Sequence, residues 1–194
     1  WNMLWKETTM KYTLPIVLIG PMGSGKTTIA KLLEQKTRIR NVPLDMIRWY
    51  YYFRNGYSLA EDQAQEIFED KANYWKRFDL KAMEQVLLDF NDAIVDFGAG
   101  HSYYPDELEL EQAKRVLSQF PNVFLLLPSE DFEDSIRICA ERIKEKWPNI
   151  LPEIVEYNQR FFEHKSNVEL ARWIVYTEGK DPEQVVEEIV SKLQ

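Results

Sequence analysis

Short apolar runs rich in β-branched and aromatic residues alternate along the chain with longer segments whose apolar positions recur at helical spacing. The runs occupy residues 16–19, 93–95, 123–127 and 173–176, with a weaker one at 42–44. The helical pattern covers residues 26–35, 58–90, 106–119, 131–146, 153–163 and 183–193. Five short strands alternating with helices predict an α/β fold in which a parallel sheet is covered on both faces.

Two helix starts are marked by capping residues. Ser58 is followed by Glu61, and Asp181 is followed by Pro182 and Gln184. In both places a short oxygen-bearing side chain precedes a residue that can reach back to the helix start. We therefore predict helices that begin directly after Ser58 and Asp181.

No repeat, flexible linker or change of composition divides the chain, which predicts a single domain over residues 12–194. The helical region 58–90 has no strand beside it before residue 93, so we expect a small helical lobe on the sheet. Residues 1–11 lack the segments of a signal peptide. We interpret them as a leader or an expression remnant, with Met10 as a candidate native start.

Composition narrows the function classes. The 194 residues are 45% hydrophobic with 7 Gly and 9 Pro, which excludes collagen-like and largely disordered chains. The formal charge of −8 disfavours broad nucleic-acid binding, so any anion must be bound locally. One cysteine, Cys139, and two histidines exclude a disulfide framework and leave little room for zinc. With no apolar run of roughly 20 residues, we expect a cytoplasmic protein with no membrane, nucleic-acid or obligate protein partner.

A glycine-rich phosphate motif lies between the first run and the first helical segment. Residues 20–27, GPMGSGKT, match the pattern G-x-x-x-x-G-K-[ST], in which backbone N–H groups and a helix N-terminus bind phosphates. In this pattern Lys26 reaches the β and γ phosphates and Thr27 binds Mg²⁺, so ATP and Mg²⁺ are the expected ligands. The predicted nucleotide-binding residues are Gly20, Met22, Gly23, Ser24, Gly25, Lys26, Thr27 and Thr28. The motif alone does not separate a kinase from a GTPase, a motor or a regulatory ATPase.

Two aspartates follow predicted strands, at the edge where open α/β sheets bind ligands. Asp45 comes after the run 42–44 and is a candidate for metal or acceptor binding, or else a solvated residue or helix cap. Asp96 ends the apolar sequence Ile-Val-Asp, as an acid that reaches Mg²⁺ from the neighbouring strand does. Its alternative is a buried polar network.

These features resemble the shikimate kinase family of P-loop proteins. Residues 56–60, GYSLA, resemble the family's G-x-S-I-x segment, and residues 98–100, GAG, resemble its triple-glycine motif. Residues 123–127 resemble the strand before the lid, and Asp181-Pro182 resembles the adenine loop. The resemblance covers most of residues 14–193. It implies a three-layer fold with strand order 2-3-1-4-5, an acceptor-binding lobe over about 46–90 and a lid over about 137–152. It also implies transfer of the γ-phosphoryl group of ATP to a hydroxyl of a small molecule.

The resemblance also assigns roles to individual residues. Arg137 and Pro182 would pack on the two sides of adenine, and Arg142 would contact phosphate, with Lys144 or Lys146 as substitutes. The catalytic residues would be Lys26, Asp45, Asp96 and Arg142, and the metal would be held by Thr27 with Asp45 or Asp96. The acceptor would be bound by Asp45, Lys81, Gly98, Ala99, Gly100, His101 and Arg160. The alternatives are a solvated helix face for the lid arginines and a solvent-facing or capping role for His101.

Three departures from the family pattern concern the acceptor. One acid, Asp45, stands where the family has Asp-x-Asp, and Leu80-Lys81-Ala82-Met83-Glu84 has lysine at the arginine of Phe-Arg-x-x-Glu. Shikimate kinases also lack an acid at the position of Asp96. Because lysine does not reproduce the planar guanidinium fork, we predict an acceptor other than shikimate.

Two further functions stay open. Asp96 and the aromatic residues 49–53 favour a nucleoside or nucleotide kinase, although the aromatic run is also typical of packing between lobe and sheet. The other alternative is an ATP-binding regulatory protein without catalysis.

Overall fold

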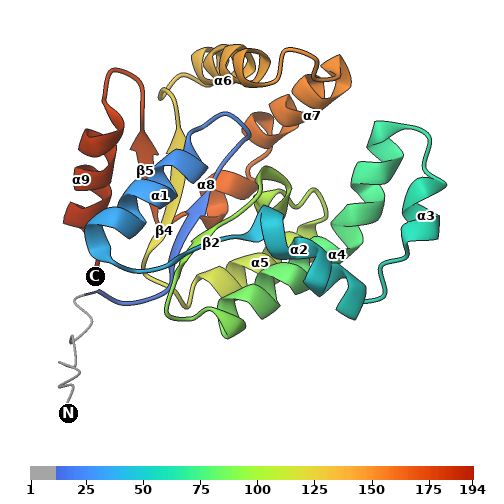
Figure 1. The fold of residues 1–194 in the computed structure, drawn as a ribbon, viewed down its shortest axis with the longest axis horizontal. Helices are drawn as coiled ribbons and strands as arrows, with labels where there is room; N and C mark the ends of the chain where they lie inside the picture. Colours follow the sequence, from blue (N-terminus) through green and yellow to red (C-terminus); the bar gives the residue numbers. More distant parts are fainter. Residues whose placement is uncertain (1–11) are drawn as a thin grey trace, which may run out of the picture.

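The computed structural model describes residues 12–194, so the predicted leader over 1–11 lies outside the described residues. Strand β1 (Ile16–Ile19) lies at the centre of a parallel sheet with the order β2-β3-β1-β4-β5 (Figure 1). The other strands are β2 (Asn41–Pro43), β3 (Ile94–Asp96), β4 (Val123–Leu127) and β5 (Trp173–Tyr176). In register, Val17 is paired with Val95 on one side and Val123 on the other. The predicted α/β class and strand order are confirmed.

Helices cover both faces of the sheet. They are α1 (Lys26–Thr37), α2 (Leu44–Arg54), α3 (Leu59–Gln63), α4 (Phe68–Asp89), α5 (Glu107–Leu117), α6 (Phe132–Lys146), α7 (Pro152–Glu163), α8 (Ser166–Leu170) and α9 (Pro182–Lys192), with the 3₁₀ turn η1 (Ala99–Ser102). One core layer joins α1 and α9 to the strand side chains Ile16, Leu18 and Phe124. The other joins α2, α4, α5 and α8 to Val17, Ile19 and Leu125, as parallel strands buried on both faces require.

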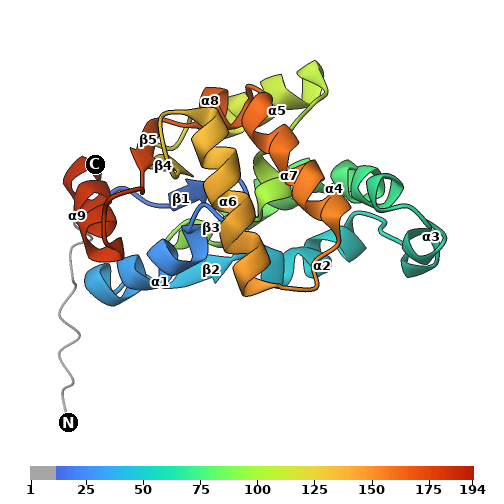
Figure 2. The same cartoon turned by 90° about the horizontal axis from the view of Figure 1, so that it is seen from above.

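Helices α6 and α7 lie at the carboxyl ends of the strands, and α3 and α4 project to one side of the sheet (Figures 1 and 2). The carboxyl edge is therefore where the loops after β1, β2 and β3 meet the later helices. No helix within residues 12–194 has both the length and the apolar composition needed to cross a bilayer.

The predicted helical region 58–90 contains two helices, α3 and α4. Ser58 Oγ accepts a hydrogen bond from the Glu61 backbone N–H at 3.3 Å, as expected of a cap, but α3 ends after five residues. The Trp75 indole donates to Asp62 Oδ1 at 2.6 Å and holds α3 against α4. The separation of α3 from α4 is thus accompanied by a contact between the two helices, which the hydrophobic spacing of the sequence does not reveal.

The second predicted helix start has both halves of a capping box. The Gln184 backbone N–H donates to Asp181 Oδ1 at 2.8 Å, and the Asp181 N–H donates to Gln184 Oε1 at 2.9 Å. Pro182 occupies the first turn, where its missing N–H is harmless. This cap fixes the loop between β5 and α9 at the carboxyl edge of the sheet.

Candidate active site

The glycine-rich loop folds around its own lysine. Lys26 is buried, and its Nζ donates to the carbonyl oxygens of Gly20 at 2.8 Å and Pro21 at 2.9 Å. Burial lowers the pKa of Lys26, although Asp96 and Asp45 act in the opposite direction. Ser24 Oγ is also buried, and it has no hydrogen-bond partner among residues 12–194. The loop therefore holds a cation and a free hydroxyl where phosphate oxygens are expected.

Gly23 is required by the packing of this loop. Its φ is +84°, and an added Cβ would lie 2.8 Å from the carbonyl oxygen of Cys139 in α6. Met22, the residue before it, is held by Asn158 of α7, whose Oδ1 accepts from the Met22 N–H at 2.8 Å and whose Nδ2 donates to the Met22 carbonyl at 3.1 Å. Helices α6 and α7 thus pack against the phosphate loop and hold it in place.

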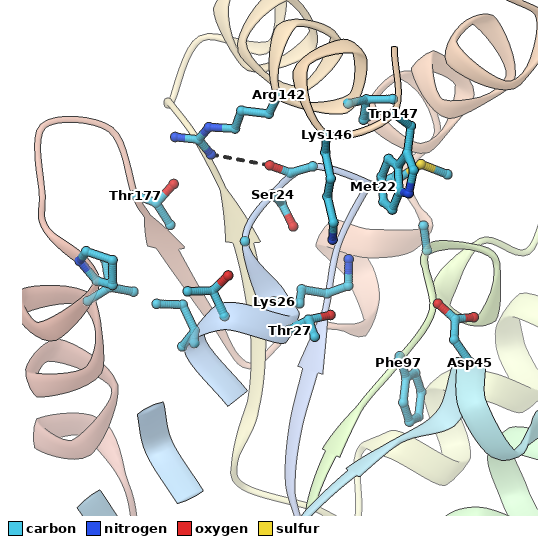
Figure 3. Close-up of a pocket in the computed structure, with 18 of the residues that line it drawn as sticks. Met22, Ser24, Lys26, Thr27, Asp45, Phe97, Arg142, Lys146, Trp147 and Thr177 are labelled. Carbon is cyan, nitrogen blue, oxygen red and sulfur yellow. Dashed lines mark hydrogen bonds between the residues drawn. The ribbon is translucent and has the colours of Figure 1, made fainter. Parts of the chain in front are cut away.

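A cavity of about 400 Å³ opens from this loop toward α6 and the loop before α9 (Figure 3). Arg142 Nη1 donates to the Gly23 carbonyl at 3.3 Å, and Lys146 and Trp147 lie on the same side of the cavity. Pro182 and Thr177 form the opposite end. Of the predicted nucleotide-binding residues, those lining this cavity are Met22, Gly23, Ser24, Gly25, Lys26, Thr27, Thr28 and Pro182. Gly20 contributes its carbonyl to Lys26 instead.

Thr27 and Asp96 provide oxygen atoms next to Lys26. Asp96 ends β3, is 4% exposed and accepts a hydrogen bond from the Thr27 side chain. Burial raises the pKa of Asp96, while Lys26 and Thr27 counteract this effect. A hydroxyl and a carboxylate are ligands of the kind that Mg²⁺ takes together with phosphate oxygens, so these residues fit the expected ion.

A second cavity, of about 370 Å³, lies between α2, α4, η1 and α7. Met22, Asp45 and Ala99 line both cavities, so the two spaces meet beside the phosphate loop. Asp45 lies in the first turn of α2 and rests on the backbone of Gly98, where an added Cβ would lie 1.9 Å from Asp45 Oδ1. The missing side chain of Gly98 is what lets this carboxylate lie at the junction.

Buried polar groups form the floor of the second cavity. Asp79 of α4 accepts hydrogen bonds from the Tyr52 hydroxyl and, at 2.7 Å, from Lys76 Nζ, which also donates to the Gly100 carbonyl at 2.5 Å. His101 Nε2 lies 3.5 Å from Asp79 Oδ1. This network ties the Gly98–Gly100 loop to α4.

The same network sets two pKa values. Burial lowers the pKa of His101, against the attraction of Asp79 and Asp45, so the neutral imidazole is favoured. Burial alone would raise the pKa of Asp79, but the ion pair and hydrogen bond of Lys76, together with the hydrogen bond of Tyr52, outweigh it and hold that pKa below its usual range. The Asp79 carboxylate is therefore ionised next to a neutral His101.

Three predicted cations lie outside the cavities. Lys81 is exposed and pairs with Glu84 at 2.7 Å, and Arg160 pairs with Glu69 at 2.7 Å across to α4. Arg137 is exposed and pairs with Asp134 and Glu141. The structure thus places these three side chains away from the lining of both cavities, and acceptor binding by Lys81 and Arg160 and adenine packing by Arg137 stay predictions.

Helix geometry explains two of these positions. Five residues along an α-helix turn a side chain by about 140°, so Arg137 and Arg142 cannot face the same cavity, and neither can Lys81 and Lys76. Lys76 lines the second cavity, and residues 75–79, WKRFD, have the spacing of Phe-Arg-x-x-Glu with lysine and aspartate in place of arginine and glutamate. A match that begins five residues before the one read from the sequence therefore places its lysine and its acid at the second cavity.

Three residues at the cavities or the phosphate loop were not predicted from the sequence: Arg48, Asp79 and Asn158. The acid three residues after Lys76 is a local signal that could have identified Asp79.

The aromatic run is divided by the helix. Tyr51 and Tyr52 are buried while Tyr50 and Phe53 are exposed, and of these rings Tyr52 lines the second cavity. Because consecutive residues point to all sides of α2, most of the run packs the lobe against the sheet.

Comparisons with known proteins agree with this geometry. The shikimate kinase family model matches residues 22–194. A shikimate kinase from Sulfurihydrogenibium sp. is 25% identical over 185 residues and aligns with 92% of this chain and 97% of its own. A shikimate kinase from Acinetobacter baumannii, solved in complex with shikimate, has a TM-score of 0.63 at 15% identity and covers 93% of both chains. A gluconokinase from Sinorhizobium meliloti has a TM-score of 0.55 at 14% identity and covers 93% of this chain and 91% of that one.

The family match extends from the phosphate loop through the last helix, and the solved structures share the fold of the sheet. The chain belongs to the shikimate kinase family and is a P-loop kinase that acts on a hydroxyl group.

Proposed function

We propose that this kinase transfers the γ-phosphoryl group of ATP to a hydroxyl of a small polar metabolite other than shikimate. The observation that carries the proposal is the meeting of two cavities at Met22, Asp45 and Ala99. One cavity holds the phosphate loop and the other holds a polar network under aromatic walls. A donor in the first and an acceptor in the second would meet at Asp45.

The side chains at this junction suit phosphoryl transfer. Lys26 and Arg142 would stabilise the negative charge that spreads over the γ-phosphoryl oxygens. Asp45 would accept a hydrogen bond from the acceptor hydroxyl and point its oxygen at phosphorus. Thr27 and Asp96 would hold Mg²⁺, which neutralises charge on the phosphate oxygens when bound.

Two features support an acceptor other than shikimate. Lys76 takes the place of the family's arginine, and its ammonium is already bonded to Asp79 and to the Gly100 carbonyl. Asp45 is the one acid where the family has two in Asp-x-Asp. A lysine ammonium does not reproduce the planar guanidinium fork, so recognition of the acceptor must rest in part on other residues.

The aromatic walls favour a second candidate, a nucleoside or nucleotide kinase. The second cavity, called the acceptor-side cavity from here on, is lined by Trp75, Tyr103, Tyr157 and Phe161. Their rings offer faces on which a base can stack. Asp96 at the end of β3 matches the acid that nucleoside monophosphate kinases carry there. A protein that binds ATP without catalysis is the third candidate, and the same assay addresses all three.

The test is phosphoryl transfer from ATP to a panel of shikimate, D-gluconate, cyclic polyols, nucleosides and nucleoside monophosphates. ADP formation is followed by a coupled assay, and the phosphorylated product by ³¹P NMR. We expect turnover with a hydroxyl compound other than shikimate and its loss in Lys26→Ala. Turnover with shikimate above all other compounds, full turnover by Lys26→Ala, or no transfer to any compound would contradict the proposal.

A further inference from the structure

Arg48 reaches the acceptor-side cavity from α2 between two tryptophan rings. Its guanidinium carbon lies 4.6 Å from the centroid of Trp49 and 5.1 Å from that of Trp75. Trp75 is itself fixed, because its indole N–H donates to Asp62. Stacking on aromatic faces holds the planar guanidinium in one orientation before any ligand binds.

Part of this guanidinium has no partner within residues 12–194. Arg48 Nε is buried and makes no hydrogen bond, and Nη1 forms an ion pair with Asp45 Oδ1 whose 3.6 Å separation is too long for a hydrogen bond. A buried donor left unpaired is destabilising, and more so when it belongs to a charged group. An acceptor atom entering the cavity would remove this destabilisation.

The other cations near this cavity are already engaged. Lys76, which also lines it, is bonded to Asp79 and the Gly100 carbonyl. Arg160 and Lys81 lie outside it and are paired with glutamates. Arg48 and Lys76 are the two basic residues that line the cavity, and of these Arg48 has a donor without a hydrogen bond.

We propose that Arg48 determines specificity by binding an anionic group of the phosphoryl acceptor, a carboxylate or a phosphate ester. This inference rests on the proposed function. A preorganised guanidinium suits these groups because its parallel N–H donors match their two oxygens. The anion then lies on the α2 side of the cavity, away from Arg160 and Lys81, and the aromatic walls cover the remainder of the ligand.

Binding of matched pairs of acids and neutral compounds tests the proposal. With the nucleotide site saturated by Mg²⁺ and ADP, calorimetry measures D-gluconate against D-glucitol, shikimate against its methyl ester, and sn-glycerol 3-phosphate against glycerol. We expect at least one acid to bind more tightly than its neutral counterpart. The carboxylate and phosphate pairs separate the two sources of negative charge.

Variants of Arg48 then show whether this residue causes the preference. Arg48→Gln should weaken binding of the preferred acid by roughly 10- to 100-fold and leave its neutral counterpart unchanged. Arg48→Lys should recover only part of the affinity, because an ammonium lacks the planar fork. Trp75→Phe retains the charge and tests the preorganisation separately if Arg48→Gln does not fold.

Arg54→Gln is the matched control. Arg54 belongs to the same helix, but its guanidinium lies over the ring of Tyr50 and donates to the Tyr50 hydroxyl, and it does not line the cavity. This variant should bind all six compounds as the wild type does.

Several results would overturn the inference: no binding of any of the three acids, equal binding of acids and neutral compounds, or the same preference in Arg48→Gln. Efficient transfer to a neutral polyol that is indifferent to Arg48→Gln would overturn the inference and leave the proposed function intact. Arginine-dependent binding of an acid, without transfer to any hydroxyl compound, would overturn the proposed function alone.

Discussion

Replacing Gly98 by alanine tests whether catalysis depends on where Asp45 rests. Gly98 has φ −60° and ψ 151°, so alanine adopts this backbone without strain. The new Cβ would stand 1.9 Å from Asp45 Oδ1 and 2.5 Å from its Cγ. Because the Asp45 side chain is 59% exposed, the carboxylate has space to move aside and the backbone does not have to shift.

The size of the displacement follows from the contact distance. Non-bonded heavy atoms pack at about 3.5 Å, so the carboxylate must withdraw by roughly 1.5 Å. Misplacement of an orienting group by about 1 Å can cost about 100-fold in rate. We therefore expect Gly98→Ala to lower kcat by roughly 100-fold, while the free energy of unfolding changes by less than about 1 kcal/mol.

The assay is acceptor-dependent ADP formation with the best compound of the panel, together with urea unfolding and Mg²⁺–ADP binding. Gly100→Ala is the matched control, because its Cβ would meet Asp79 Oδ2 at 3.6 Å, an ordinary contact. It should leave Asp45 in place and retain most of kcat. Wild-type kcat in Gly98→Ala, or an equal loss in Gly100→Ala, would refute the reasoning. So would a Gly98→Ala/Asp45→Ala double variant far less active than Asp45→Ala, because the two changes should not add.

Three other substitutions give further tests. Asp96→Asn removes a buried charge whose pKa burial has raised, so the free energy of unfolding at pH 7 should be unchanged or higher in urea titrations, while Mg²⁺-dependent transfer falls by at least about 100-fold. Asp79→Asn should lower the free energy of unfolding by about 3 kcal/mol at pH 7, because it leaves Lys76 without a counter-charge. Since the pKa of Asp79 is held below its usual range, this stabilisation is present above about pH 4 and is lost as the pH falls further, so the wild type and Asp79→Asn should converge in acid. Asn158→Ala removes both side-chain hydrogen bonds to the phosphate loop and should raise KM for ATP several-fold at a cost of about 2 kcal/mol in stability, and an unchanged KM would contradict the supporting role of α7.

The sequence by itself determined the fold and the nucleotide site. Strands and helices follow from local periodicity, and the phosphate motif is eight consecutive residues whose geometry depends on glycines at positive φ and on the start of one helix. Asp45 and Asp96 were identified because the ends of parallel strands meet at one edge of the sheet. Such features are encoded within short segments, so one sequence is enough to find them.

Only the tertiary structure decided which side chains line the second, acceptor-side cavity. Lys76 and Lys81 lie on the same helix and differ in direction by about 140°, and the contacts of α4 select the first. Arg160 lies outside the cavity, where it is bound by Glu69, 91 residues away in sequence. Arg48 lines the cavity, where its guanidinium lies over the ring of Trp75 from another helix. These choices depend on which helix faces pack together, and no local pattern records that packing.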